Sequence, residues 1–205
     1  MAKSFVGLSS AKTNNHKKSS ADKAEIRALV LAQIPDARVF DAYAGAGMMW
    51  RKVWRNAANY VGCDRKWYPD DRTCYVADNR RVMRAIDLDG FNVFDFDAYG
   101  SPWECVEILA ARRTVSSGER VGLVLTEGSA LKLKFGDLPS SLSRFANLEK
   151  DRMGGGLNQA HELLIDRAIA QVERRLAARV IKRWEARRKS GTNMCYIGLV
   201  LEGGQ

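Results

Sequence analysis

The sequence lacks a long apolar run and has few of the residues that build metal or disulfide sites. A transmembrane helix needs about 20 consecutive apolar residues, and no such run occurs in the 205 residues. The N-terminus, Met-Ala-Lys-Ser, has no apolar core of a signal peptide. The two histidines and four isolated cysteines include no pair with metal-ligand spacing. We therefore expect no membrane partner, no metal site, and buried free thiols in a reducing cytoplasm.

Internal repeats are also absent, and length and composition fit one domain. A chain of 205 residues with 46% hydrophobic residues is large enough to bury a core. We expect a flexible basic arm over residues 1–20, because this segment is polar and has four lysines and no acid. Residues 21–205 would form a single domain. Within it, residues 128–157 fit no single period and are expected to be an irregular insertion.

Short apolar runs alternate with helical patterns along most of the chain. The expected strands are 38–43, 60–64, 73–77, 91–96, 121–126 and 194–201. A long helix is expected from about 158 to 189, where apolar residues recur at four-residue spacing. Strands separated by helices predict an α/β fold, a doubly wound and mainly parallel seven-strand-like sheet with helices on both faces.

The most informative motif follows the first expected strand. The segment Asp41-Ala42-Tyr43-Ala44-Gly45-Ala46-Gly47 ends an apolar run in a small-residue loop, and the next run ends in Asp64. In a doubly wound sheet such glycines let the backbone approach a nucleotide-type cofactor, and such an acid binds ribose hydroxyls. The third glycine of the dinucleotide pattern is missing, because Met48 follows at once. A loop without that glycine suits S-adenosylmethionine (SAM) better than NAD. A tight turn with no ligand is the alternative.

This motif and the acid after it resemble the Rossmann-fold SAM-dependent methyltransferases, and the resemblance extends from about Arg38 to Leu201. It implies SAM as the cofactor. The expected cofactor-binding residues are Asp41, Tyr43, Gly45, Gly47, Asp64, Asp78 and Asn79. Asp41 would orient the loop or meet the methionine amino group, and Asp78 would accept from the adenine amine. Asp78 could equally cap the helix that begins near Arg80.

A second motif follows the fourth expected strand, Phe94-Asp95-Phe96-Asp97-Ala98-Tyr99-Gly100-Ser101-Pro102-Trp103. Ligands of doubly wound sheets bind at the carboxyl ends of strands. Methylation of an exocyclic base amine needs an acceptor that draws on the amine hydrogens and aligns the nitrogen, and an aromatic ring beside it can stack on the base. Asp97 is the expected acceptor and Tyr99 the expected stacking ring, so these two are the expected catalytic residues.

This segment resembles the Asp-Pro-Pro-Tyr type motif of amino-methyltransferases. It is more similar to the Asp-Pro-Phe/Tyr-Gly-Ser-Pro motif of tRNA guanine N2-dimethyltransferases. Ala98 departs from both, because these families have proline there. The 205 residues leave no room for the large extra domain of those tRNA enzymes, so their substrate is not implied. The alternative interpretation makes Asp97 a helix cap and Tyr99 a core residue.

Charge is the second bulk property that bears on function. Lysine and arginine outnumber acidic residues by 33 to 24, giving a formal net charge of +9. Such an excess favours a polyanionic partner, most simply nucleic acid. The expected nucleic-acid-binding residues are Lys17, Lys18, Lys132, Lys134, Arg174, Arg175 and Arg179. A solvated helix face explains the late arginines equally well.

We therefore expect a SAM-dependent methyltransferase acting on DNA or RNA, at an exocyclic base amine. One alternative is a small-molecule or protein methyltransferase, for which a closed pocket would be the mark. Another is a non-catalytic methyltransferase-fold protein that binds nucleic acid or regulates a partner. Ala98 favours this second alternative, whereas the glycine loop and Asp64 oppose it.

Overall fold

The computed structural model describes residues 17–134, 137–147, 157–187 and 194–204. The strands in this part of the chain are β1 (Arg38–Asp41), β2 (Asn59–Asp64), β3 (Cys74–Val76), β4 (Val93–Phe96), β5 (Arg120–Glu127), β6 (Ala178–Arg187) and β7 (Cys195–Gly203). The helices are α1 (Lys17–Leu31), α2 (Met48–Lys52), the 3-10 helix η1 (Trp54–Asn56), α3 (Asn79–Ala85), α4 (Trp103–Arg112), α5 (Ala130–Lys134), α6 (Ser140–Phe145) and α7 (Leu157–Leu176). Among these described helices, none has the length and apolar character needed to cross a membrane.

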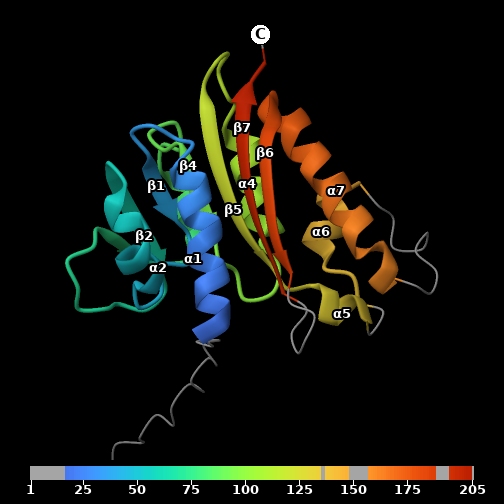
Figure 1. Cartoon of the computed structure of the whole chain (residues 1–205), viewed down its shortest axis with the longest axis horizontal. Coiled ribbons are helices and arrows are strands. Elements are labelled where there is room, and N and C mark those ends of the chain that lie inside the picture. The colour runs from blue at the N-terminus through green and yellow to red at the C-terminus, as the bar shows by residue number, and fades with distance from the viewer. Residues whose placement is uncertain (1–16, 135–136, 148–156, 188–193, 205) are drawn as a thin grey trace, which may run out of the picture.

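The strands form one seven-stranded sheet in the order β3-β2-β1-β4-β5-β7-β6. The first five strands are parallel, and β7 runs antiparallel to both β5 and β6. The strand order reverses between β1 and β4, which is the point where doubly wound sheets bind ligands. The carboxyl ends of β1 to β5 therefore meet at one edge, the lower edge in Figure 1. The expected α/β fold is confirmed, and the sheet is mixed because of the antiparallel β6–β7 hairpin.

Helices cover both faces of the sheet, because successive strand residues point to opposite sides. On β4, Val93 belongs to the core beneath α1 and α2, whereas Phe94 and Phe96 belong to the larger core beneath α3, α4, α6 and α7. In Figure 1, α1 crosses in front of the sheet and α4 lies behind it. Asp95 and Asp97 thus share the α1 face with Val93.

The expected helix over 158–189 is wrong in its second half. Helix α7 ends at Leu176, Ala177 takes a left-handed φ of 53°, and the chain returns as β6. Val180 and Trp184 continue the four-residue spacing of α7, but they pair with Leu201 and Gly198 of β7 instead. Pairing satisfies the backbone groups along the outer side of β7, and tertiary hydrogen bonding of this kind overrides local helical periodicity.

Two expected irregular segments are partly regular. Helix α1 begins at Lys17, inside the expected arm, and Ser19 and Ser20 are buried. Residues 1–16 lie outside the described part of the chain. The expected insertion at 128–157 contains α5 and α6, which bury Leu133, Leu142 and Phe145 against the larger core. These apolar residues sit in helices too short to show a clear period, which is why the sequence pattern missed them.

Candidate functional site

The loop between β1 and α2 takes the conformation that its glycines predict. Gly45 and Gly47 have φ values of 47° and 75°, a region that favours glycine. Arg72 donates to the carbonyl oxygens of Ala44 at 3.0 Å and Gly45 at 2.8 Å. A Cβ at Gly47 would lie 2.8 Å from the Arg72 guanidinium carbon. The Arg72 side chain is only 1% exposed, so it supports the loop from beneath. Nothing in the sequence marks this residue except its position two residues after Asp70.

Asp64 lies beside this loop at the end of β2. One carboxylate oxygen accepts the Gly45 backbone N–H at 3.0 Å, and the other accepts the Lys66 backbone N–H at 2.8 Å. The expected ribose-binding acid and the expected glycine loop are therefore in direct contact. A carboxylate has about four acceptor positions, so Asp64 retains capacity to accept from hydroxyl groups.

Asp41 lies beneath the loop and is 3% exposed. Its carboxylate accepts the Tyr60 hydroxyl at 2.9 Å and the Tyr43 backbone N–H at 3.1 Å. Burial, with the neighbouring Asp95 charge, raises the pKa of Asp41 to about 8. These contacts fit the first of the two roles expected for Asp41, that of orienting the loop. The Tyr43 hydroxyl lies 3.4 Å from the Cys105 sulfur.

Asp78 and Asn79 link the end of β3 to α3. Asp78 is the N-cap of α3 and accepts the Arg80 backbone N–H at 3.0 Å. It also binds the guanidinium groups of Arg80 and Arg65, and these hydrogen bonds hold its pKa well below the usual range. Asn79 donates its side-chain amide to the carbonyl of Ala42 at 2.9 Å. The capping role considered for Asp78 is therefore present.

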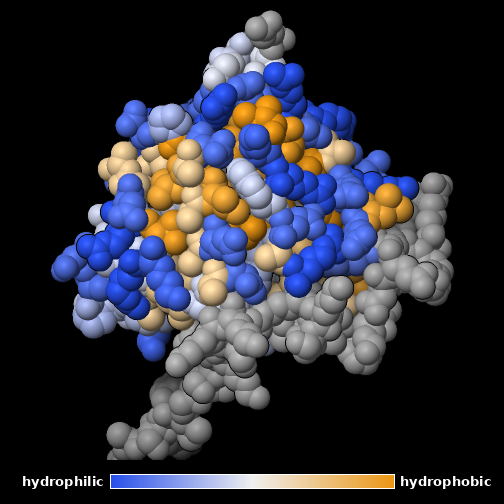
Figure 2. Space-filling view, in the orientation of Figure 1, coloured by the Kyte–Doolittle hydropathy of each residue, from blue (hydrophilic) through white to orange (hydrophobic). Residues whose placement is uncertain are grey.

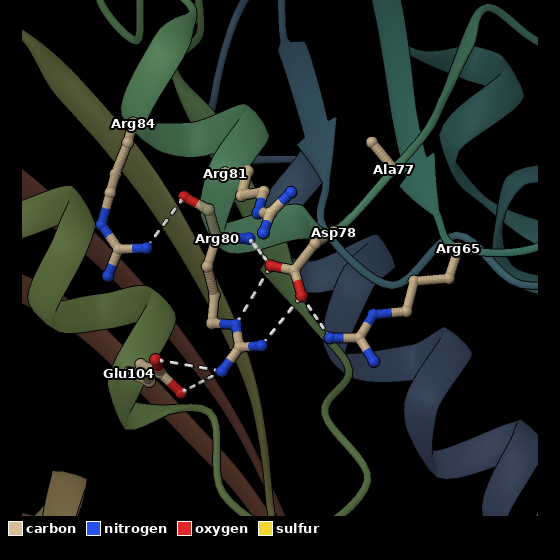
Figure 3. Close-up of a pocket in the computed structure, with 7 residues that line it drawn as sticks. All are labelled: Arg65, Ala77, Asp78, Arg80, Arg81, Arg84 and Glu104. Atoms are coloured by element: carbon tan, nitrogen blue, oxygen red, sulfur yellow. Dashed lines mark hydrogen bonds and ion pairs between the residues drawn. The ribbon is translucent and has the colours of Figure 1, made fainter.

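A hollow of about 460 Å³ opens beside Asp78. Figure 3 shows Arg65 and Arg80 turned toward Asp78 from opposite sides, with Glu104 on the far side of Arg80. The residues that line this hollow are Arg65, Ala77, Asp78, Arg80, Arg81, Arg84 and Glu104. Because Ala77 and Asp78 directly follow β3, this hollow belongs to the same sheet edge as the glycine loop.

The two acids of β4 are paired with basic residues of α1. Arg27 binds Asp95 through two hydrogen bonds of 2.6 and 2.7 Å, and the indole N–H of Trp54 donates to the same carboxylate at 2.7 Å. Arg27 and Asp95 are both fully buried. Lys23 contacts both oxygens of Asp97, at 2.6 and 2.8 Å. The pairs align because an i, i+4 step on a helix and an i, i+2 step on a strand each span about 6 Å.

These pairs set the charge of Asp97. Burial opposes ionisation of this carboxyl group, but Arg27 and Lys23 outweigh burial and hold its pKa below the usual range. Asp97 is therefore an ionised acceptor rather than a proton-holding acid at neutral pH. The sequence pattern missed Lys23 and Arg27, although their i, i+4 spacing next to the apolar residues of α1 was a usable signal.

The turn after Asp97 presents Tyr99 to solvent. Tyr99 is 87% exposed, so the alternative that made it a core residue is wrong. Asp97 does not cap α4 either, because its N-cap position is Pro102 and has no side-chain cap bond. Ala98 is buried and donates its backbone N–H to the Phe96 carbonyl at 2.9 Å. Proline has no N–H, so here a hydrogen bond replaces the ring that the resembling motif contains.

A second hollow, of about 740 Å³, adjoins the first and shares Glu104 with it. It is lined by Ser101, Glu104, Lys132, Asp137, Leu138, Pro139, Ser140, Ser141, Ser143 and Arg144. The structure thus brings the expected Lys132 close to the second motif. Lys17 and Lys18 begin α1, whose N-terminus lies at this same lower edge in Figure 1. The side chains of Lys17, Lys18 and Lys134 lie outside the described part.

Most of the late arginines of α7 and β6 lie away from this edge of the sheet. Arg174 and Arg175 occupy the last turn of α7, where the Leu176 carbonyl accepts the backbone N–H of Val115. Arg179 lies on β6 and pairs with Glu202, which also binds Arg120 at the start of β5. The start of β5 is the edge opposite the glycine loop, roughly 25 Å away for an eight-residue strand. The structure therefore does not bring Arg174 or Arg179 to the candidate site. The Arg175 guanidinium lies 4.8 Å from the centre of the Phe145 ring on α6, next to Arg144 of the second hollow.

The described residues fit a nucleoside cofactor that has no phosphate group. The loop offers backbone and small side chains, Asp64 offers free acceptor positions beside it, and the hollow at Ala77 and Asp78 continues the same edge. Arg72 does not obstruct this edge, because its side chain is buried beneath the loop. The backbone at Gly45 and Gly47 would lie against the ligand, Asp64 would accept hydrogen bonds from the ribose, and Asp78 with Asn79 would face the adenine.

Comparison with known proteins identifies the fold. A scan against protein-family models and a search of curated proteins both find no match. Among solved structures, the chain is similar to Trm1 from Pyrococcus horikoshii with S-adenosyl-L-methionine, at TM-score 0.64 and 15% identity, covering 98% of this chain and 59% of that one. It is also similar to TYW2 from M. jannaschii in complex with AdoMet, at TM-score 0.55 and 11% identity, covering 96% and 80%.

A third similar structure is the N-methyltransferase NodS from Bradyrhizobium japonicum WM9 in complex with S-adenosyl-L-homocysteine. Its TM-score is 0.54 at 9% identity, covering 95% of this chain and 90% of that one. The chain therefore has the Rossmann-type fold of SAM-dependent methyltransferases, and it spans 59% of the length of the Trm1 chain. At these identities the likeness shows the fold alone.

Proposed function

We propose that the protein is a SAM-dependent methyltransferase that acts on an exocyclic amine of a nucleic-acid base. The observation that carries this proposal is the contact between the Gly45 amide and the Asp64 carboxylate. This contact joins two parts of a cofactor site. One is a loop whose glycines let the backbone approach a ligand, and the other is an acid that can accept hydrogen bonds from ribose hydroxyls. The cofactors in the similar Trm1, TYW2 and NodS structures support the choice of SAM.

Asp97 is the acceptor for the amine to be methylated. SAM supplies an electrophilic methyl group on a sulfonium centre. With SAM held at Gly45, Gly47 and Asp64, the amine would take this methyl group, S-adenosylhomocysteine would be released, and the amine proton would go to solvent. Asp97 accepts a hydrogen bond from that amine and so directs the nitrogen lone pair. Because Lys23 and Arg27 keep Asp97 ionised, it orients the amine and holds no proton itself at neutral pH.

Tyr99 is the platform for the target base. An exposed ring of this kind, next to an acceptor at a ligand-binding edge, is suited to stack on a base that has left its helix. The Asp97-to-Pro102 segment is similar to the motif of tRNA guanine N2-dimethyltransferases, which supports a base amine as the target. The net charge of +9 supports a polyanionic substrate.

Calorimetry tests the cofactor part of the proposal. The protein should bind SAM or its demethylated product at micromolar affinity, about −8 kcal/mol. Asp64→Ala should weaken this binding by about 1–3 kcal/mol, because ribose hydrogen bonds are lost. Asp36→Asn is the control, since Asp36 lies in the turn after α1 near the start of β1, at the opposite edge, and asparagine removes the charge while tolerating its left-handed φ of 51°. Absence of SAM binding, or tighter binding of NAD, would contradict the assignment.

A further inference from the structure

The hollow beside Asp78 carries four arginines, which we call the arginine rim: Arg65, Arg80, Arg81 and Arg84. Two carboxylates line the same hollow, Asp78 and Glu104. The described lining therefore has a surplus of two positive charges. It lies at the carboxyl edge of the sheet, beside the residues proposed to hold the cofactor.

The surplus belongs to Arg81 and Arg84. Arg65 and Arg80 both bind Asp78, and Arg80 also reaches Glu104 at 3.3 Å. Neither Arg81 nor Arg84 has a carboxylate of the described residues within ion-pair distance. Arg84 donates to the Arg80 carbonyl at 3.4 Å (Figure 3). Both side chains are exposed. Their guanidinium groups can therefore bind an anion, and their planar geometry matches phosphate.

Ion pairs among the described residues account for Arg80 on helix α3, but not for Arg81 or Arg84. The seven residues of α3, Asn-Arg-Arg-Val-Met-Arg-Ala, include three arginines and no acid. Arg80 and Arg84 are four residues apart, a spacing at which like charges destabilise a helix. A solvated helix face usually mixes charges of both signs. Ion pairing on a solvated face therefore explains Arg81 and Arg84 poorly.

Three late arginines are paired with acids, unlike Arg81 and Arg84. Arg179 pairs with Glu202, Arg183 with Asp166 and Glu185, and Arg187 with Glu162 and Glu185. Arg179 also lies at the edge opposite the site. The uncompensated positive charge that adjoins the site is thus on α3 and not on β6.

We propose that Arg81 and Arg84 bind backbone phosphates of a single-stranded segment of the nucleic-acid substrate, next to the base held at Asp97 and Tyr99. This inference rests on the proposed function. A single strand fits because the target base must leave its stack to reach the half-buried acceptor Asp97. Phosphates of such strands also follow positively charged surfaces. The arginine rim then fixes where the strand lies relative to the base site.

Binding of a fluorescent single-stranded RNA oligonucleotide, measured over a range of salt concentrations, tests this inference. Arg81→Ala/Arg84→Ala should weaken RNA binding at low salt by about tenfold per arginine, or about 1.4 kcal/mol each, because each loses a charge-assisted hydrogen bond to a phosphate. The salt slope should fall by about 0.7 for each lost phosphate contact. Calorimetry on the same variant should show unchanged SAM affinity, which also reports correct folding.

Arg174→Ala/Arg179→Ala is the matched comparison, since it removes the same charge from the opposite edge. The inference expects RNA affinity and salt slope close to those of the unmodified protein. An equal loss in both double variants would mean diffuse attraction and overturn the inference. So would a loss of SAM affinity in the Arg81/Arg84 variant, because the arginines would then serve the cofactor.

RNA binding that is strong in the unmodified protein and unchanged by Arg81→Ala/Arg84→Ala overturns the inference but leaves the proposed function standing. If the unmodified protein at low salt binds neither this RNA oligonucleotide nor single-stranded DNA of the same sequence, both the inference and the proposed function are contradicted.

Discussion

At the scale of single residues, the two acids of β4 have different surroundings and different consequences. Asp95 is fully buried and bound by Arg27 and Trp54, whereas Asp97 is partly exposed and bound by Lys23. Asp95 therefore fastens α1 to the sheet, and Asp97 is left at the edge where a ligand can reach it. The sequence places both acids at the end of an apolar strand, but it does not separate these two roles.

Removing Arg27 should be strongly destabilising. Arg27→Met leaves the Asp95 charge buried without a partner, which costs about 3–5 kcal/mol. Urea unfolding measures the loss. The double variant Arg27→Met/Asp95→Asn should recover much of it, because the buried charge is gone. A double variant as unstable as the single one would mean that Arg27 acts through packing and not through the ion pair.

Asp41 should make stability fall with rising pH. Its pKa of about 8 lies above the ordinary value of about 3.9 for aspartate. Between these values the folded protein keeps a proton that the unfolded chain has released, so this group's contribution to stability is lost as pH rises toward 8. Asp41→Asn stays neutral throughout. Its free energy of unfolding, relative to the unmodified protein, should increase from pH 5 to pH 8, and a difference that is independent of pH would contradict this assignment.

At the scale of elements, the glycine loop depends on Arg72 as well as on its own sequence. Gly47→Ala combines a strained φ of 75° with a close approach to the Arg72 guanidinium. Gly118→Ala is a matched control, because Gly118 has φ 73° and no atom within 4 Å of an added Cβ. Strain alone costs about 1–3 kcal/mol. Thermal unfolding should show a larger loss for Gly47→Ala, and only this variant should lose SAM affinity. Equal losses of stability in the two variants would mean that the close approach to Arg72 contributes nothing.

The elements nearest the cofactor edge were the best predicted from sequence. Strand ends and the glycine loop depend on local rules, namely apolar runs and glycine conformations, and β1, β2 and β4 end within two residues of expectation. The α7–β6 boundary could not be predicted, because Ala177 turns the chain without glycine or proline. Arg72 and the α1–β4 ion pairs depend on contacts between distant segments, which one sequence does not display.

At the scale of the whole molecule, net charge indicates a class of partner but not the surface that meets it. In Figure 2, hydrophilic residues dominate the side where β6 and α7 lie, and hydrophobic residues gather around α1. Much of the late basic charge on that side is paired with Asp166, Glu185 or Glu202. The positive surplus at the hollow beside Asp78 lies on α3, a segment that a count of charges along the chain does not single out.

The most direct test of the central claim is transfer of a radiolabelled methyl group from SAM to total RNA, tRNA or genomic DNA. The account expects label in one of these substrates that nuclease digestion releases as a base methylated on its exocyclic amine. Asp97→Ala should lower the rate by about 10²–10³-fold, as loss of one transition-state hydrogen bond does, with SAM affinity nearly unchanged. No transfer to any nucleic acid by a protein that binds SAM, or full activity of Asp97→Ala, would contradict the account.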